Sequence, residues 1–175
     1  IELHEPFEDG RSIAAKRYRT AQKDTKPEMV NAMVKRALNA GIMADYLLAD
    51  AWFGTKAMIR LTQETALVPV LRMKKNNMKY RLSEFVRGET VTRELDAQAL
   101  YKRCVRKTWQ PIRAQKYQAK IVDVELNLAE NKDYEEWVKV RLLFVRGSAG
   151  DNQAPAGKHD WAVFLTTDTA LSPAD

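Results

Sequence analysis

The chain has 175 residues, of which 45% are hydrophobic and 30% charged, a balance typical of a globular protein and not of a disordered one. No apolar run approaches the roughly 18 residues of a membrane span. A single cysteine, Cys104, excludes an internal disulfide and is typical of a reducing cytosol, where we expect the protein. With only two distant histidines and no cysteine pair, the sequence does not predict a zinc site.

The net charge of +6 is unevenly distributed along the chain. Residues 72–120 contain 14 Lys and Arg against 4 Asp and Glu, so this segment carries +10 and the remainder −4. Such an asymmetry predicts a polyanionic partner for the middle of the chain. The alternative is a solvated basic surface that binds no partner.

The first clear element is a helix over residues 25–41. Apolar residues recur there at the helical spacing, Pro27 lies near the start and Gly41 is placed to end the helix. We expect its apolar stripe to pack in a core. Residues 45–49 follow as a short apolar run without alternation, which is typical of a strand covered on both faces.

A second helix is predicted over residues 54–65, with Thr55 as its cap, and a second strand over residues 66–73. Pro69 in this strand cannot donate a backbone hydrogen bond, so we expect the strand to pair on one side only at that point. Helix, strand, helix and strand at this spacing predict an α/β unit with a parallel sheet.

The remainder of the chain changes character after residue 73. A polar, basic stretch and a short helix over residues 96–107 precede two strands, at 121–128 and 137–145, that predict a half-solvated antiparallel hairpin. A last strand covers residues 161–166. We therefore expect the strands at 45–49, 67–73 and 161–166 to share one sheet, with a separate strand-bearing unit projecting from it at 76–160.

Asp50 directly follows the strand at 45–49. In open α/β sheets, functional groups collect at the carboxyl ends of the strands. A carboxylate there is reachable by solvent yet held by a rigid strand, which suits the binding of a hard divalent cation. The alternative is that Asp50 caps the next helix or ends a turn.

Two stretches, ADYLLADAWFGTKAMIRL and WAVFLTTDTALSPAD, together with the preceding helix, resemble the bacterial insertion-sequence transposases of the DDE type. In that family the second catalytic Asp ends a core strand and an aromatic follows two or three residues later, as Trp52 and Phe53 follow Asp50. The family's next strand often runs into Lys and Asn, matched here by VLRMKKNN. The resemblance implies a partial ribonuclease-H-like core at 1–75 and 161–175, interrupted by a β-rich basic insertion at 76–160.

The resemblance implies metal-dependent cleavage and strand transfer of DNA in cut-and-paste transposition. Two Mg²⁺ or Mn²⁺ ions would be held by three carboxylates, of which Asp50 is one. The first catalytic Asp of the family is not assigned to Asp9 or Asp24, because both lie too close to Asp50 and in no apolar strand. The catalytic Glu is expected on a helix beyond TALSPAD. We therefore expect the chain to be an excised piece that is inactive alone. The parent is expected to be a bacterial, nucleoid-associated protein. It would act on transposon ends and target DNA, as a homodimer in the synaptic complex.

Several other residues are candidates for DNA contacts or for packing. Trp52 and Phe53 are expected in the core and Trp109 as a packing residue, and Asp168 as a loop acid after the last strand. The candidates for contact with the DNA backbone are Lys74, Lys75 and Asn76 after a core strand, and Lys102, Arg103, Arg106 and Lys107 in the basic middle.

Two other functions remain open at this point. One is a non-catalytic DNA-binding or assembly module in which Asp50 is structural. The other is a different nuclease with a ribonuclease-H-like fold. A transposase would have two further catalytic carboxylates besides Asp50, one of them the Glu on a helix beyond TALSPAD. These features separate it from both alternatives.

Overall fold

A computed structural model describes residues 9–104, 107–112, 117–131, 133–147 and 161–173. Arg106, one of the candidate DNA contacts, lies outside these residues. The chain divides into two compact units, Ile1–Met43 and Ala44–Asp175. None of the described helices is long and apolar enough to cross a membrane.

The first unit contains two helices, α1 (Ile13–Lys23) and α2 (Lys26–Asn39). The start of α2 is fixed by Glu28, whose carboxylate accepts hydrogen bonds from the Thr25 backbone N–H at 2.6 Å and from its hydroxyl at 2.8 Å. The predicted helix is confirmed, but its expected core packing is wrong. Helix α2 has no buried residue, and Met33 is 59% exposed.

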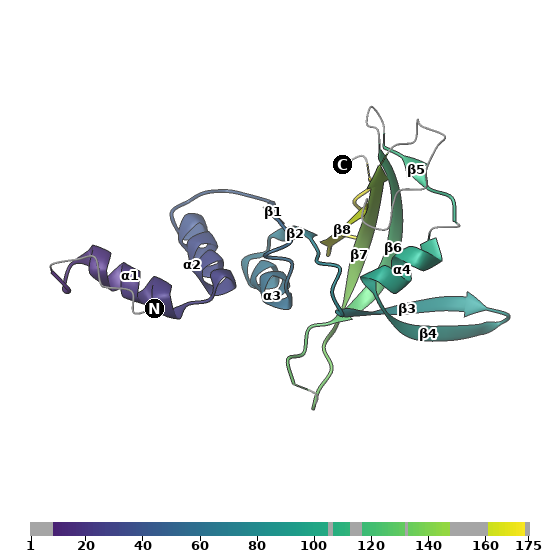
Figure 1. Cartoon of the computed structure of the whole chain (residues 1–175), viewed down its shortest axis with the longest axis horizontal. Helices are drawn as coiled ribbons and strands as arrows, with labels where there is room; N and C mark the ends of the chain where they lie inside the picture. The colour runs from purple at the N-terminus through teal and green to yellow at the C-terminus, as the bar shows by residue number, and fades with distance from the viewer. Residues whose placement is uncertain (1–8, 105–106, 113–116, 132, 148–160, 174–175) are drawn as a thin grey trace. The chain divides into compact units, whose positions relative to one another are not determined.

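The second unit is built on one mixed sheet of eight strands (Figure 1). The strand order is β1-β2-β8-β7-β6-β3-β4, with β5 paired to β6. Strands β1 and β2 are parallel, and every other pair is antiparallel. The strands are β1 (Tyr46–Ala49), β2 (Val68–Arg72), β3 (Lys79–Val86), β4 (Glu89–Asp96), β5 (Gln110–Pro111), β6 (Tyr117–Asn127), β7 (Trp137–Gly147) and β8 (Trp161–Thr166).

Helix α3 (Lys56–Thr65) connects the two parallel strands, as the sequence predicts. Thr55 is its N-cap, and the hydroxyl of Thr55 accepts a hydrogen bond from the Met58 N–H at 3.4 Å. The helix buries Met58, Ile59 and Leu61. These buried side chains anchor the β1–α3–β2 unit to the rest of the domain.

One face of the sheet forms the main core beneath helix α4 (Ala97–Cys104). Tyr101 of α4 stacks on Trp161 of β8 with ring centroids 4.2 Å apart, and its ring lies 5.9 Å from that of Phe144 on β7. Side chains on one face of a strand recur every second residue. The buried positions on this face follow that rule: Val124, Leu126, Val140, Leu142, Phe144, Val163 and Leu165.

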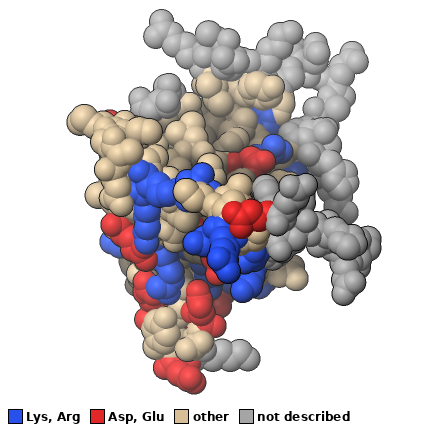
Figure 2. Space-filling view, turned by 90° about the vertical axis from the view of Figure 1, so that its left-hand side faces the viewer, with Lys and Arg blue, Asp and Glu red and all other residues tan. Residues whose placement is uncertain are grey.

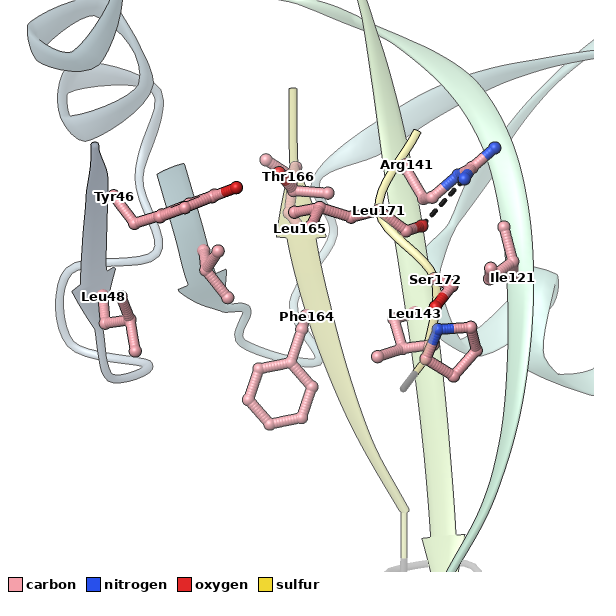
Figure 3. A pocket seen from close by; sticks show the side chains of 12 residues that line it. Tyr46, Leu48, Ile121, Arg141, Leu143, Phe164, Leu165, Thr166, Leu171 and Ser172 are labelled. Atoms are coloured by element: carbon pink, nitrogen blue, oxygen red, sulfur yellow. Dashed lines mark hydrogen bonds between the residues drawn. The ribbon is translucent and has the colours of Figure 1, made fainter. Parts of the chain in front are cut away.

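The opposite face of the sheet carries an apolar groove of about 350 Å³ (Figure 3). Leu48, Leu143 and Phe164 line it from three different strands. The segment after β8 crosses this face, where the Leu171 carbonyl accepts a hydrogen bond from Arg141 at 2.9 Å.

The fold class and most predicted elements are confirmed: a mixed α/β protein whose strands β1, β2 and β8 share one sheet. At Pro69 the strand β2 pairs only with β1, because its pairing with β8 begins at Val70. The β6–β7 hairpin is also as predicted and extends over eleven paired residues.

One expectation is wrong: the described strands within residues 76–160 do not form a separate unit that projects from the sheet. Strand β7 pairs with β8 from Arg141 to Arg146, and β6 pairs with β3, so the hairpin continues the same sheet. The physical reason is that β8 has two edges of backbone N–H and C=O groups to satisfy, and β2 satisfies only one of them.

Candidate functional site

The loop after β1 holds Asp50 in a tight turn. One carboxylate oxygen of Asp50 accepts a hydrogen bond from the Trp52 N–H at 2.9 Å, and its backbone carbonyl accepts from the Phe53 N–H at 3.0 Å. The Thr55 N–H then donates to the Phe53 carbonyl at 2.8 Å. Asp50 itself is exposed. The carboxylate is thus fixed by its own loop while one of its oxygens faces no protein donor among the described residues.

Gly54 lets this loop lie directly against the end of β2. A Cβ atom built at Gly54 would be 2.4 Å from the Arg72 carbonyl oxygen and 3.1 Å from the Cα of Met73. No side chain fits at the first of these distances, since real Cβ contacts stay beyond 3.0 Å. Glycine is therefore required by close backbone approach, and the approach sets the position of the Asp50 turn relative to β2.

The helix-cap alternative for Asp50 is wrong, because Thr55 occupies the N-cap of α3. The turn alternative holds in part, since the carboxylate accepts the Trp52 N–H and closes a turn of its own. Within the described part of the chain, no Lys or Arg forms an ion pair with Asp50. Its charge is therefore not neutralised by those residues.

The lysines that follow β2 reach the same edge of the sheet as Asp50. Strands β1 and β2 are parallel, with Ala49 opposite Leu71, so both strands end at this edge. The Lys74 ammonium lies 4.6 Å from the centroid of the Trp52 ring, and the Lys75 ammonium lies 4.2 Å from that of Trp161. Asp50, Trp52, Lys74 and Lys75 define what we term the carboxyl edge.

The remaining candidates for DNA contact lie apart from the carboxyl edge or are already engaged. Arg103 and Lys107 both form ion pairs with Glu84, the latter at 3.7 Å, whereas Lys102 is exposed. The Asn76 side-chain oxygen accepts a hydrogen bond from the Met78 N–H at 3.2 Å. Lys75 connects the carboxyl edge to α4, because the Lys75 carbonyl accepts a hydrogen bond from the Gln98 side chain in α4 at 3.3 Å.

Basic and acidic side chains are interspersed on the face seen in Figure 2, where blue and red groups adjoin. Several of the basic side chains counted in residues 72–120 form ion pairs with acids of the same segment, such as Lys79–Asp96, at 3.1 Å, and Arg103–Glu84. Exposed ion pairs of this kind contribute little to stability. They lower the positive potential that a polyanion would meet.

Of the predictions made for aromatic residues, the one for Trp109 is confirmed and the one for Trp52 is wrong. Trp109 is buried, as expected of a packing residue, and its indole N–H donates to the Cys104 carbonyl at 3.0 Å. Burial also raises the pKa of the Cys104 thiol. Trp52, expected in the core, is 63% exposed, and Phe53 is half-buried. The exposure of Trp52 follows from the Asp50 turn, which no periodicity in the sequence reveals.

Asp168 lies at the other edge of the sheet from Asp50. Strand β8 runs antiparallel to β2, and its last residue, Thr166, pairs with Val70 in the middle of β2, so the chain leaves β8 toward the start of β2. Asp168 accepts a hydrogen bond from the Ala170 N–H at 2.7 Å. It therefore acts as a turn acid, and the fold does not bring it to the carboxyl edge.

The carboxyl edge offers one hard oxygen ligand and two ammonium groups. No group of three or more His, Cys, Asp or Glu residues in the described ranges could hold a metal ion. Asp50 fits a divalent cation as a single ligand, because it is exposed and has no ion-pair partner there. The lysines beside it suit an anion such as a phosphodiester.

A family model for the DDE superfamily endonucleases matches residues 4–125, which is more than half of the chain. The matched range includes Asp50, Trp52 and both lysines of the carboxyl edge. No curated protein and no solved structure gives a match.

Proposed function

The chain belongs to the DDE superfamily endonucleases, and we propose that it takes part in DNA strand cleavage and strand transfer as part of a transposase. The observation that supports this most directly is the placement of Asp50. The residue that the resemblance identifies as a catalytic Asp stands at the carboxyl end of a parallel strand, exposed and held by its own turn.

In this proposal Asp50 is both a catalytic residue and a metal ligand. A carboxylate held rigidly by its loop binds a cation with little reorganisation. Mg²⁺ or Mn²⁺, when bound, supplies positive charge at the reacting phosphate and acidifies a water molecule. Because Mg²⁺ takes several oxygen ligands, further carboxylates from outside the described residues complete the site.

The lysines and Asn76 position the DNA. Lys74 and Lys75 follow the strand next to Asp50 and offer ammonium groups to the phosphates on either side of the scissile bond. Lys102, Arg103, Arg106 and Lys107 would extend this contact along the DNA backbone toward α4.

Transposon ends and target DNA are the proposed substrates, and a homodimer in the synaptic complex is the proposed assembly. We keep the division into a catalytic core, 1–75 with 161–175, and a basic insertion at 76–160. The continuous sheet does not conflict with this division, because an inserted hairpin can extend a sheet from its edge strand.

The test replaces Asp50 by Asn in the complete transposase and measures cleavage of duplex DNA in Mg²⁺. Asn keeps the shape and the hydrogen bond to the Trp52 N–H but loses the charge. We expect cleavage to be lost, with DNA binding and thermal stability nearly unchanged. Asp168→Asn is a matched control, because Asp168 also follows a strand and also accepts a backbone N–H two residues later.

A second readout uses the 175-residue chain itself. Mn²⁺ should broaden the NMR signals around Asp50. We expect a dissociation constant for Mn²⁺ in the millimolar range, since one carboxylate leaves most of the ion's shell to water. Asp50→Asn should abolish this broadening. In the cleavage assay, retained cleavage with lost stability in Asp50→Asn would identify Asp50 as a structural residue and overturn its catalytic role.

A further inference from the structure

We propose that Trp52 is a stacking platform for one unpaired DNA base beside Asp50. This contact rests on the proposed function, and it adds an aromatic contact to the charged ones. Trp52 is the only exposed one of the four tryptophans, all of which the structure describes. Its exposed fraction is 63%, against 7% for Trp109 and 6% for Trp161.

The backbone of Trp52 is held in place by contacts on both sides. Its N–H donates to the Asp50 carboxylate at 2.9 Å, and two residues later Gly54 lies against the Arg72 carbonyl. The loop is therefore clamped between its own turn and the end of β2. The indole is held outward by a fixed backbone, so a base that stacks on it meets a platform ordered in advance.

The surroundings of the Trp52 ring match the parts of a nucleotide. A base has an apolar π-face, and its flanking phosphates carry negative charge. Trp52 presents an indole, Lys74 holds an ammonium 4.6 Å from that ring, and Lys75 holds a second one 4.2 Å from Trp161. The Lys74 ammonium lies over one face of the indole, so the proposed base would stack on the other face. Aromatic rings accompanied by basic side chains are the arrangement by which proteins bind single strands without reading their sequence.

The occupant is an unpaired base and not one inside a duplex. In a duplex both faces of each base are covered by neighbouring bases, so only an unstacked base can lie on the indole. Asp50 and Trp52 are joined by a hydrogen bond. A base held on Trp52 would therefore place its own phosphodiester close to the proposed catalytic carboxylate.

Three other aromatic side chains, Phe85, Tyr117 and Trp137, lack this combination. Phe85, 78% exposed, lies near the tip of the β3–β4 hairpin, one residue from the Arg87–Gly88 turn. Tyr117 is 49% exposed at the start of β6. Trp137 is half-buried, with the Arg81 guanidinium 3.4 Å from its ring centroid. Trp52 alone among these joins high exposure, a cation on its ring and a direct bond to Asp50.

The experiment titrates the 175-residue chain with a single-stranded thymidine oligonucleotide and with the same strand carrying abasic residues. Fluorescence anisotropy of labelled DNA gives the affinity, and intrinsic tryptophan fluorescence reports stacking. The variants are Trp52→Ala, Trp52→Phe and, as a matched control, Phe85→Ala, which removes another exposed aromatic.

We expect Trp52→Ala to weaken binding of the thymidine strand by about 5- to 150-fold, the range for loss of one base–aromatic stack. Trp52→Phe should restore most of the affinity and Phe85→Ala should change little. The wild-type chain should bind abasic DNA more weakly than the thymidine strand. The Trp52→Ala chain should bind the two strands equally well. The salt dependence of binding should be equal in wild type and Trp52→Ala, because the phosphate contacts remain.

Unchanged affinity in Trp52→Ala, with equal binding of abasic DNA by wild type, would overturn the stacking inference alone. An equal loss in Trp52→Ala and Phe85→Ala would also overturn it, because the effect would not be local. No binding of single-stranded or duplex DNA at low salt would instead overturn the DNA contacts of the proposed function. Circular dichroism of each variant separates these outcomes from misfolding, and Trp52→Gln serves if the alanine variant does not fold.

Discussion

Replacing Gly54 by Ala tests the clamp that positions the Asp50 turn. The added Cβ would stand 2.4 Å from the Arg72 carbonyl oxygen and 3.1 Å from both the Cα and the sulfur of Met73. The methionine side chain can rotate away, but the carbonyl belongs to the backbone of β2. The loop or the strand end must therefore move by more than half an ångström to reach a contact of 3.0 Å or longer.

Forced overpacking of this kind costs about 1–3 kcal/mol of unfolding free energy. For a chain of this size each kcal/mol lowers the melting temperature by about 2–4 °C. We therefore expect Gly54→Ala to melt about 2–12 °C below wild type by circular dichroism. The emission of Trp52 should also change, because the displaced loop carries its ring.

Gly147→Ala is the matched control for this substitution. Nothing lies within 4 Å of a Cβ built at Gly147, so the same change of residue should leave stability within about 0.5 kcal/mol of wild type. If Gly54→Ala melts with the control, the loop yields freely and the clamp does not hold Asp50. If both variants lose stability equally, the loss is not specific to the contact with Arg72, since the effect of Gly→Ala on the unfolded chain would stabilise the fold instead.

Two further predictions concern the β3–β4 hairpin and helix α4. Gly88→Ala should cost about 1–2 kcal/mol in urea unfolding, because Gly88 has φ +90° with open space around it; a neutral result would mean that the turn relaxes to another type. Asp96→Ala should cost about 1 kcal/mol, since the Asp96 carboxylate accepts the Ala99 N–H at 2.9 Å and caps α4. That hydrogen bond, with a smaller part from Lys79, lowers the pKa of Asp96 below its ordinary 3.8. The stabilisation by the ionised form is thus fully present above pH 3.8 and is lost as pH falls through the lower folded value; a difference between wild type and Asp96→Ala that already shrinks near neutral pH would contradict this.

Strong local periodicity explains which elements could be predicted from the sequence. Helices α2 and α3 have apolar residues at helical spacing, with Pro27 near the start of α2 and Thr55 as the cap of α3. Strand β6 alternates between apolar and polar residues. Each of these signals lies within about a dozen residues of the chain, so no knowledge of distant contacts is needed.

The β3–β4 hairpin could not be predicted from such signals. Its strands are polar on both faces over much of their length, and its turn uses Arg87 at φ 53° before Gly88, a pair less typical than Asn-Gly. The continuity of the sheet has no signal in the sequence for a related reason. Pairing between β7 and β8 lies outside either strand's local pattern, because it is made by backbone groups that carry no residue-specific signal.

The candidate site was predictable only in part. The position of Asp50 follows from the rule that functional groups gather where parallel strands end. The requirement for Gly54 and the exposure of Trp52 depend on how closely the loop approaches Arg72, which is a tertiary contact. A glycine after two aromatic residues was the one visible signal, and close packing is among the few reasons for a glycine without positive φ.

The direction of β8 decides which acids can join Asp50. A strand parallel to β2 would have brought the acid that follows it, Asp168, to the carboxyl edge. Because β8 is antiparallel, its end pairs with Val70 and Asp168 lies at the opposite edge of the sheet. A carboxylate that completes a metal site with Asp50 must therefore come from a segment that reaches the ends of β1 and β2. A short sequence separation from the last strand is not sufficient.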